Sequence, residues 1–138
     1  MTDVKPPSRV LLTGGAGFVG SNLARYLLAR LPDLSLTVLD DTSTGFWRLL
    51  PDDPRLTRVD GSVTDAPLID RLVGESEMVF HLAARNIIAS TNNPLSDFEV
   101  NIGGTLNVLM AARRHGNRRV VYSSSASVYG NPRYLPIA

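Results

Sequence analysis

Short apolar runs alternate with segments of helical periodicity along this chain. In the helical segments apolar residues recur three or four positions apart, as they do on one face of a helix. Regular alternation of strands and helices predicts a parallel sheet with right-handed crossover connections. The pattern predicts strands at 9–13, 35–40, 56–60, 78–82 and 119–123, and helices at 17–30, 66–73 and 95–115, with a short helical stretch at 46–50.

The predicted helices carry recognisable start and stop signals. Asp65 can cap the helix at 66–73, and Gly116 can close the helix at 95–115. The polar and small residues that precede this last helix, through Pro94, predict a loop. The apolar residues expected to form the buried stripe of the last helix are Phe98, Ile102, Leu106, Leu109 and Met110.

A glycine-rich turn, Thr13–Gly20, joins the first strand to the first helix. The first N–H groups of a helix lack partners within it and lie at the positive end of its dipole, so phosphate binds well there. Gly14 permits the tight turn, Gly17 lets a pyrophosphate approach the backbone, and Gly20 lets the helix pack closely on the strand. A turn without a ligand is the alternative, but the strand before it and the helix after it favour a phosphate site.

The second strand ends in Asp40, twenty residues after Gly20. An acidic residue in this place can accept hydrogen bonds from the hydroxyls of an adenosine ribose. It also repels a 2′-phosphate, so Asp40 favours NAD over NADP, and Asp41 is expected to add to the repulsion. The sequence therefore predicts an α/β Rossmann-type doubly wound sheet with strand order 3-2-1-4-5, and a dinucleotide across the carboxyl ends of its strands.

Composition narrows the class of protein. The 138 residues amount to one domain, and a net charge of +1 gives no electrostatic case for binding nucleic acid or a membrane surface. The sequence has no cysteine, which excludes disulfides and zinc fingers and fits a cytoplasmic location. No apolar stretch approaches the ~20 residues of a transmembrane helix. No metal site is expected, because His81 has no ligand partner at useful spacing.

Residues at the ends of the later strands are candidates for the rest of the site. His81 is expected to be structural, and the small residues 83–84 would let a ring pass close to the backbone. Asn101 and Thr105 lie four apart on one helix face, although Asn101 alone would be interpreted as a buried polar residue tied to backbone. Serines 123–125 follow the last strand and by themselves indicate only a polar loop.

Taken together, these stretches resemble the N-terminal part of the extended short-chain dehydrogenase/reductase family. The resemblance is specific to its NAD-dependent sugar-nucleotide epimerase/dehydratase group, and it covers nearly the whole chain in the family's order. The matching stretches are 13–20, 39–41 with 43–45, 61–65, 80–84, 101–105 and 123–130.

The resemblance implies NAD as the cofactor and assigns its contacts. The pyrophosphate is then cradled by Gly14, Gly17, Phe18 and Val19. The adenosine ribose is held by Asp40 and wrapped by Asp41, Thr42, Ser43, Thr44 and Gly45, and the adenine is flanked by Ser62 and Val63. The ribose and nicotinamide side is lined by Leu82, Ala83 and Ala84, with Arg85 or Asn86 close by, and by Val100 or Asn101 and Ser123. Ser125 matches the family's catalytic Ser/Thr, which hydrogen-bonds the sugar hydroxyl that is oxidised.

Two departures from the family pattern matter. Where the family commonly has an acid that reads the adenine amino group, this chain has Ser62, so adenine affinity is expected to be lower. The family's Tyr-x-x-x-Lys motif, which supplies the general base, is also missing, and Lys5 is the only lysine in the sequence. Residues 9–138 are therefore expected to be an incomplete NAD-binding domain after a flexible arm at 1–8, truncated before the later strands and without its substrate domain.

The function expected from this resemblance is the NAD-binding portion of a sugar-nucleotide epimerase, in a fragment or a naturally short version. Ala126 and Ser127 stand where the family's dehydratases carry Asp-Glu, which favours an epimerase over a dehydratase or decarboxylase. A non-catalytic NAD-binding module and a reductase of the same superfamily are the alternatives. The partner expected in the complete enzyme is an NDP-sugar. The chain alone is expected to be inactive and to self-associate through the open side of its fifth strand.

Overall fold

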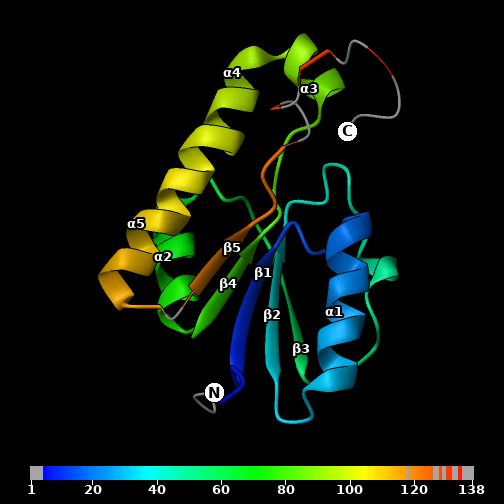
Figure 1. The fold of residues 1–138 in the computed structure, drawn as a ribbon, viewed down its shortest axis with the longest axis vertical. Helices are drawn as coiled ribbons and strands as arrows, with labels where there is room; N and C mark the ends of the chain where they lie inside the picture. The colour runs from blue at the N-terminus through cyan, green and yellow to red at the C-terminus, as the bar shows by residue number, and fades with distance from the viewer. Residues whose placement is uncertain (1–4, 118, 126–127, 129, 132–133, 135–138) are drawn as a thin grey trace.

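The computed structural model describes residues 5–117, 119–125, 128, 130, 131 and 134. They form a parallel sheet in the order β3-β2-β1-β4-β5, which confirms the predicted strand order (Figure 1). Three of the strand predictions match at both ends, and the other two strands, β4 and β5, each end one residue earlier than predicted. The strands are β1 (Arg9–Thr13), β2 (Ser35–Asp40), β3 (Leu56–Asp60), β4 (Met78–His81) and β5 (Arg119–Tyr122).

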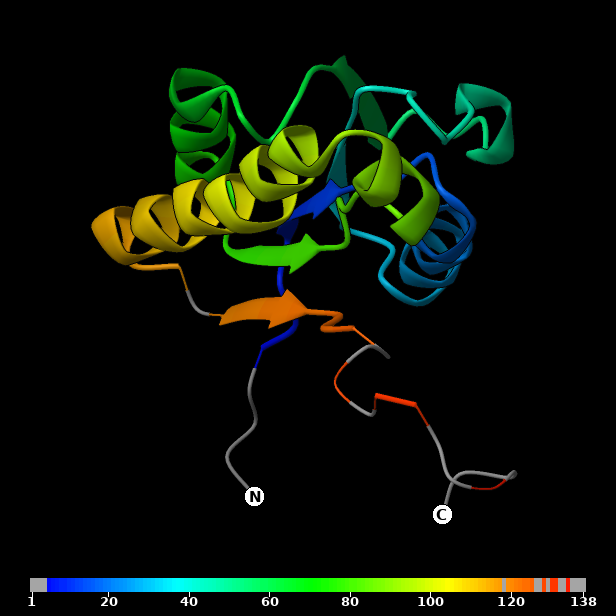
Figure 2. The same ribbon diagram turned by 90° about the horizontal axis from the view of Figure 1, so that it is seen from above.

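Helices cover both faces of this sheet (Figure 2). The helix α1 (Phe18–Arg30) and the short turn η1 (Trp47–Leu49) lie on one face, and α2 (Ala66–Gly74) and α5 (Thr105–His115) lie on the other. Side chains alternate between the faces along a strand. Within β1, Leu11 therefore joins the α2–α5 core, whereas its neighbours Val10 and Leu12 join the α1 core.

Local signals set the helix ends as the sequence predicts. Asp65 caps α2, because its Oδ1 accepts the Leu68 N–H at 3.0 Å. Gly116 ends α5 in the left-handed conformation, with φ of 67°, which glycine adopts without steric cost. At the end of α1, the Arg55 guanidinium donates to carbonyl oxygens that the helix leaves unpaired, those of Leu28 and Leu31.

The predicted loop before the last helix is wrong in part, because residues Ile87–Asn92 form the helix α3. Their polar side chains bond back to the preceding turn. Ser90 donates to the Asn86 carbonyl at 2.9 Å and Thr91 donates to the Ile87 carbonyl at 2.8 Å. Such bonds let serine and threonine stay within a helix, although a segment rich in these residues is typical of a loop.

The last predicted helix is divided into α4 (Pro94–Asp97), a π-helical segment η2 (Phe98–Gly104) and α5. Its expected buried stripe is wrong. Phe98, Ile102 and Leu106 are more than half exposed, at 55%, 57% and 57%, and Leu109 and Met110 are exposed as well. The face that packs on the sheet and on α2 consists of smaller residues. These are Val100, Gly104, Val108, Ala111 and Ala112.

Small residues lie on the inner face because the helix runs very close to the loop after β3. A Cβ on Gly104 would come within 2.4 Å of the Val63 side chain. The segment therefore has two apolar faces, and close packing selects the one with the smaller side chains. The larger side chains are left on a solvent-facing stripe, which we call the outer stripe and define as Leu95, Phe98, Ile102, Leu106, Leu109 and Met110.

Ser8, the last residue of the predicted arm at 1–8, is hydrogen bonded to the rest of the fold. Ser8 lies next to β1, and its N–H and hydroxyl bond the Glu77 carboxylate at 3.1 and 2.8 Å. The Ser8 carbonyl also accepts the Ser35 N–H at 2.8 Å. Residues 1–4 lie outside the described part of the chain. Ser8 therefore extends the contacts of the central strand β1 with the segments that begin β2 and precede β4.

No helix in the described ranges is long and apolar enough to span a membrane. The same residues contain no group of three or more His, Cys, Asp or Glu side chains that could hold a metal ion.

His81 joins β4 to its neighbouring strands β1 and β5 and to α5. Its Nδ1 is hydrogen bonded to Thr13 Oγ1 at 2.7 Å, and its Nε2 to Thr105 Oγ1 at 3.0 Å. The ring is 1% exposed and stacks on Tyr122, with 5.7 Å between centroids. These contacts bear out the expectation that His81 is structural. Burial lowers its pKa from 6.5 to about 4.

We predict that His81 makes the chain less stable in mild acid. The unfolded chain takes up a proton below pH 6.5, whereas the folded chain does so only near pH 4, so stability is complete above 6.5 and is lost as the pH falls toward 4. The loss amounts to about 3 kcal/mol. Urea unfolding of wild type and His81→Gln between pH 4 and 7.5 measures it.

The variant should show a shallower fall in unfolding free energy over this range than the wild type. His115→Gln is the matched control, because His115 lies at the surface beside Asp70. Identical pH slopes for wild type and His81→Gln would contradict the prediction.

Candidate functional site

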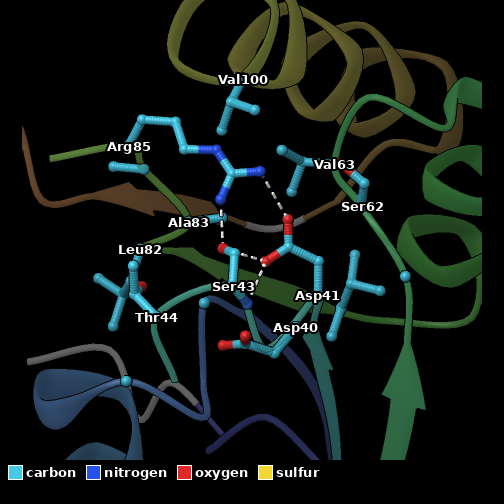
Figure 3. A pocket seen from close by; sticks show the side chains of 15 residues that line it. Asp40, Asp41, Ser43, Thr44, Ser62, Val63, Leu82, Ala83, Arg85 and Val100 are labelled. Atoms are coloured by element: carbon cyan, nitrogen blue, oxygen red, sulfur yellow. Dashed lines mark hydrogen bonds and ion pairs between the residues drawn. The ribbon is translucent and has the colours of Figure 1, made fainter. Parts of the chain in front are cut away.

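A cleft opens at the carboxyl ends of the strands, where the turns after β1, β2, β3 and β4 meet η2 (Figure 3). Thirteen of the residues predicted to bind the cofactor line it, together with Leu39 and Gly61, which the prediction missed. The sequence did offer a signal for Gly61, because this glycine directly follows a strand. The lining residues are Gly14, Gly17, Leu39, Asp40, Asp41, Ser43, Thr44, Gly61, Ser62, Val63, Leu82, Ala83, Ala84, Arg85 and Val100.

The turn after β1 forms the floor of the cleft. Gly14 has φ of 69°, and a Cβ there would lie 2.6 Å from the Ala83 backbone nitrogen. A Cβ on Gly20 would lie 2.5 Å from the Gly15 Cα, so α1 packs directly on the turn. Gly17 is the N-cap of α1 and lines the cleft. The positive end of the α1 dipole therefore opens into the cleft, as an anion site requires.

Asp40 ties the β2 end to this turn. Its Oδ2 accepts the Ala16 N–H at 2.9 Å, and its Oδ1 accepts the Thr42 N–H at 2.8 Å. The residue is 8% exposed, yet it lines the cleft. A carboxylate oxygen can accept two hydrogen bonds, so each oxygen keeps capacity for a ligand hydroxyl. The geometry fits an adenosine ribose at this position.

Asp41 is paired with a cation, Arg85. Arg85 Nη2 lies 3.0 Å from Asp41 Oδ2, and Arg85 Nη1 also bonds the Ser43 hydroxyl (Figure 3). Burial raises the pKa of Asp41, but hydrogen bonds from Ser43 and the charge of Arg85 outweigh burial and hold it below its ordinary value. Arg85 offsets part of the Asp41 charge. The part of Asp41 in repelling a 2′-phosphate stays a prediction.

The loop after β3 supplies the opposite wall. Val63 is buried, and its carbonyl accepts the Asn107 side-chain N–H at 3.0 Å, which fixes the loop against α5. The Ser62 hydroxyl accepts bonds from the Thr64 N–H and hydroxyl, at 3.2 and 2.9 Å. Ser62 therefore faces the cleft as a neutral group in a tight turn, and its contact with an adenine stays a prediction.

Asn101 holds the loop after β4 instead of lining the cleft. Its Oδ1 accepts the Arg85 N–H at 2.8 Å, and its Nδ2 donates to the Arg85 carbonyl at 3.3 Å and to Asp97 at 2.5 Å. This agrees with the interpretation of Asn101 as a polar residue tied to backbone. Its neighbour Val100 is the residue of this helix that reaches the cleft.

The remaining predicted residues lie beside the cleft. Phe18 and Val19 begin α1 with their side chains 82% and 62% exposed, so they can offer a phosphate only their backbone. Thr42 and Gly45 line a neighbouring hollow with Phe46, Trp47 and Arg48. The others outside the cleft lining are Asn86, Asn101, Ser123 and Ser125.

Ser123 and Ser125 are exposed and follow β5, on the far side of β4 from Asp40. Ser124 between them has φ of 58°, an uncommon value outside glycine, and the Ser125 carbonyl accepts the Val128 N–H at 3.3 Å. Ala126 and Ser127 lie outside the described residues. The catalytic role of Ser125 therefore stays a prediction.

Known enzymes are similar to this chain in sequence and in fold. A dTDP-glucose 4,6-dehydratase of Streptomyces antibioticus is 40% identical over 129 residues, which is 88% of this chain and 38% of that protein. A UDP-glucose 4-epimerase of Corynebacterium glutamicum is 38% identical over 132 residues, which is 94% of this chain and 38% of that protein. The chain thus spans about two fifths of the length of the relatives it matches.

Solved structures agree with these relatives. The Bordetella bronchiseptica enzyme WbmG, crystallised in complex with NAD, superposes with a TM-score of 0.85 at 33% identity, over 99% of this chain and 44% of that one. The model of the NAD dependent epimerase/dehydratase family matches residues 10–137. On this evidence, the chain belongs to the NAD dependent epimerase/dehydratase family, whose cofactor is NAD.

Proposed function

We propose that this chain is the NAD-binding portion of a sugar-nucleotide epimerase. The observation that carries the proposal is the buried Asp40 carboxylate, bonded to the glycine turn at the floor of the cleft. An acid that accepts ribose hydroxyls is expected beside the N-terminus of α1, where a pyrophosphate is favoured, and the position of Asp40 supports this assignment. The complex of WbmG with NAD, over nearly the whole of this chain, supports the same cofactor.

Each wall of the cleft has a task in this proposal. The backbone from Gly14 to Val19 cradles the pyrophosphate, and Asp40 accepts the ribose hydroxyls. Val63 supplies apolar surface for the adenine, and Leu82 supplies it on the ribose and nicotinamide side. When bound, NAD accepts a hydride from the sugar carbon whose hydroxyl Ser125 would hold. The residues of this chain thereby orient both reactants.

The proton released in this step needs a base with a pKa near the working pH. Ser125 cannot serve unaided, and no tyrosine in the 138 residues is followed by lysine four positions later. We therefore propose that the 138-residue chain binds NAD without turnover, and that catalysis requires a base supplied from outside this sequence. A module that only holds NAD is the alternative function.

An epimerase is proposed because of two small side chains. Ala126 and Ser127 follow Ser125 in the sequence, and neither can exchange protons near neutral pH. Inverting a sugar hydroxyl needs no further acid, since the keto-sugar intermediate can rotate in the site and be reduced again on its other face. Sequence identity does not decide the reaction, because dehydratases and epimerases match the chain equally well, at 40% and 38%.

The proposed reaction is tested by product analysis with the full-length protein that contains this chain. UDP-sugars should be converted into their epimers, and no 4-keto-6-deoxy sugar should form. Ser125→Ala should lower kcat by about 10², the usual cost of losing one hydrogen bond to a reacting oxygen. Thr57→Ala, on the outermost strand β3, is the control and should leave the rate unchanged. A 4-keto-6-deoxy product would overturn the proposal of an epimerase.

We also propose that copies of the chain associate through the outer stripe. The stripe presents apolar side chains along α4, η2 and α5, with Leu95, Ile102 and Leu106 each more than half exposed. Contiguous apolar patches of this kind mark interaction surfaces. On the open side of β5, by contrast, Val120 and Val121 are partly covered.

Sedimentation velocity tests the association. Leu106→Glu should shift the chain toward monomer, because a charge would be buried in the contact. Tyr26→Glu is the matched control, since Tyr26 is 56% exposed on α1, which lies on the opposite face of the sheet. A wild-type chain that stays monomeric at high micromolar concentration would contradict the proposal.

A further inference from the structure

The Arg85 side chain joins two loops that are far apart in the sequence. It starts in the loop after β4 and ends against Asp41 and Ser43 in the loop after β2 (Figure 3). Because β1 lies between β2 and β4 in the sheet, this link closes one side of the cleft into which the turn after β1 opens.

Both ends of the link are fixed. At its base, Asn101 bonds both the N–H and the carbonyl of Arg85, and Asp97 orients the Asn101 amide. At its tip, Asp41 accepts Arg85 Nη2 at 3.0 Å and is itself held by the Ser43 N–H at 3.0 Å. A long side chain anchored in this way loses less entropy when its ion pair forms than a free one.

The link is partly shielded from water. The side chains of Arg85 and Asp41 are 21% and 32% exposed, whereas those of the surface pair Arg114 and Asp70 are 61% and 36% exposed. Arg85 is also the one cationic side chain among the described residues that line the cleft. When a ligand binds, Arg85 can therefore remain paired with Asp41 or contact the ligand's pyrophosphate. The two arrangements predict different effects of substitutions on ligand release.

We propose that Arg85 stays with Asp41 and that their ion pair is a strap that retains the adenosine half of the dinucleotide. This inference rests on the proposed function. The geometry favours the strap because Ser43 and Asp41 together occupy both terminal nitrogens of the guanidinium. Arg85 is thus a positioning residue. A dinucleotide enters and leaves when the pair opens, so the strap slows both steps.

The test follows NADH fluorescence during binding and release by stopped flow with the 138-residue chain. Arg85→Met, which keeps the apolar stem, and Asp41→Asn should each release NADH about five- to tenfold faster, the effect of losing one partly buried ion pair. The double variant should be no faster than either single variant, because all three lack the same pair. Exchanging the charges, Asp41→Arg with Arg85→Asp, should restore slow release.

Arg114→Met is the matched control, because it breaks an ion pair between α5 and α2 outside the cleft, and it should leave release unchanged. If Arg85 contacts the pyrophosphate instead, Arg85→Met speeds release while Asp41→Asn slows it, and the strap is overturned. Unchanged NADH release in all variants also overturns the strap. In that case the proposed function still stands, provided that the wild type binds NADH. A wild-type chain that binds no NADH overturns both.

Discussion

The cleft depends on one buried carboxylate. Asp40 ends β2, and its two oxygens hold the Ala16 N–H of the glycine turn and the Thr42 N–H of the following loop. Burying an ionised group without such bonds would cost several kcal/mol. The turn after β1 and the loop after β2 are therefore fixed relative to each other before any ligand arrives, and the N-terminus of α1 is aimed into the cleft.

Close packing around the turn makes this arrangement specific. Gly14 lies against Ala83 of the β4 loop, and Gly20 lies against Gly15, so three segments meet with no room for side chains. On the other face, Gly104 brings η2 against Val63 and thereby places Val100 in the cleft. The walls of the cleft are thus extensions of the two cores, and their spacing follows from helix–sheet packing.

The sequence predicts the strands well because buried parallel strands are short apolar runs that end in distinctive residues, as β2 ends in Asp40. It predicts the buried face of α5 poorly, because Leu106 and Val108 are both apolar and only the approach to Val63 decides which one lies inside. The helix at Ile87–Asn92 is missed because its polar side chains bond their own backbone.

For the cleft too, the sequence predicts what local spacing determines and misses what depends on contacts between distant loops. Local spacing is enough to predict the residues of the glycine turn and of the β2 end, because each set lies within a single short segment of the chain. The pairing of Asp41 with Arg85 could not be predicted, because it joins residues 44 positions apart and depends on how Asn101 orients the β4 loop. Long-range side-chain pairs of this kind become evident only once the sheet order brings two loops together.

The central claim is that Asp40 makes the cleft a site for NAD. Calorimetric titration of the 138-residue chain with NAD and with NADP tests this directly. NADP would lose the ribose hydrogen bond and place its 2′-phosphate against the buried carboxylate, at a cost on the order of 2 kcal/mol, or about thirtyfold in Kd. NAD should bind more tightly than NADP by this factor. Equal affinities for the two dinucleotides would contradict it.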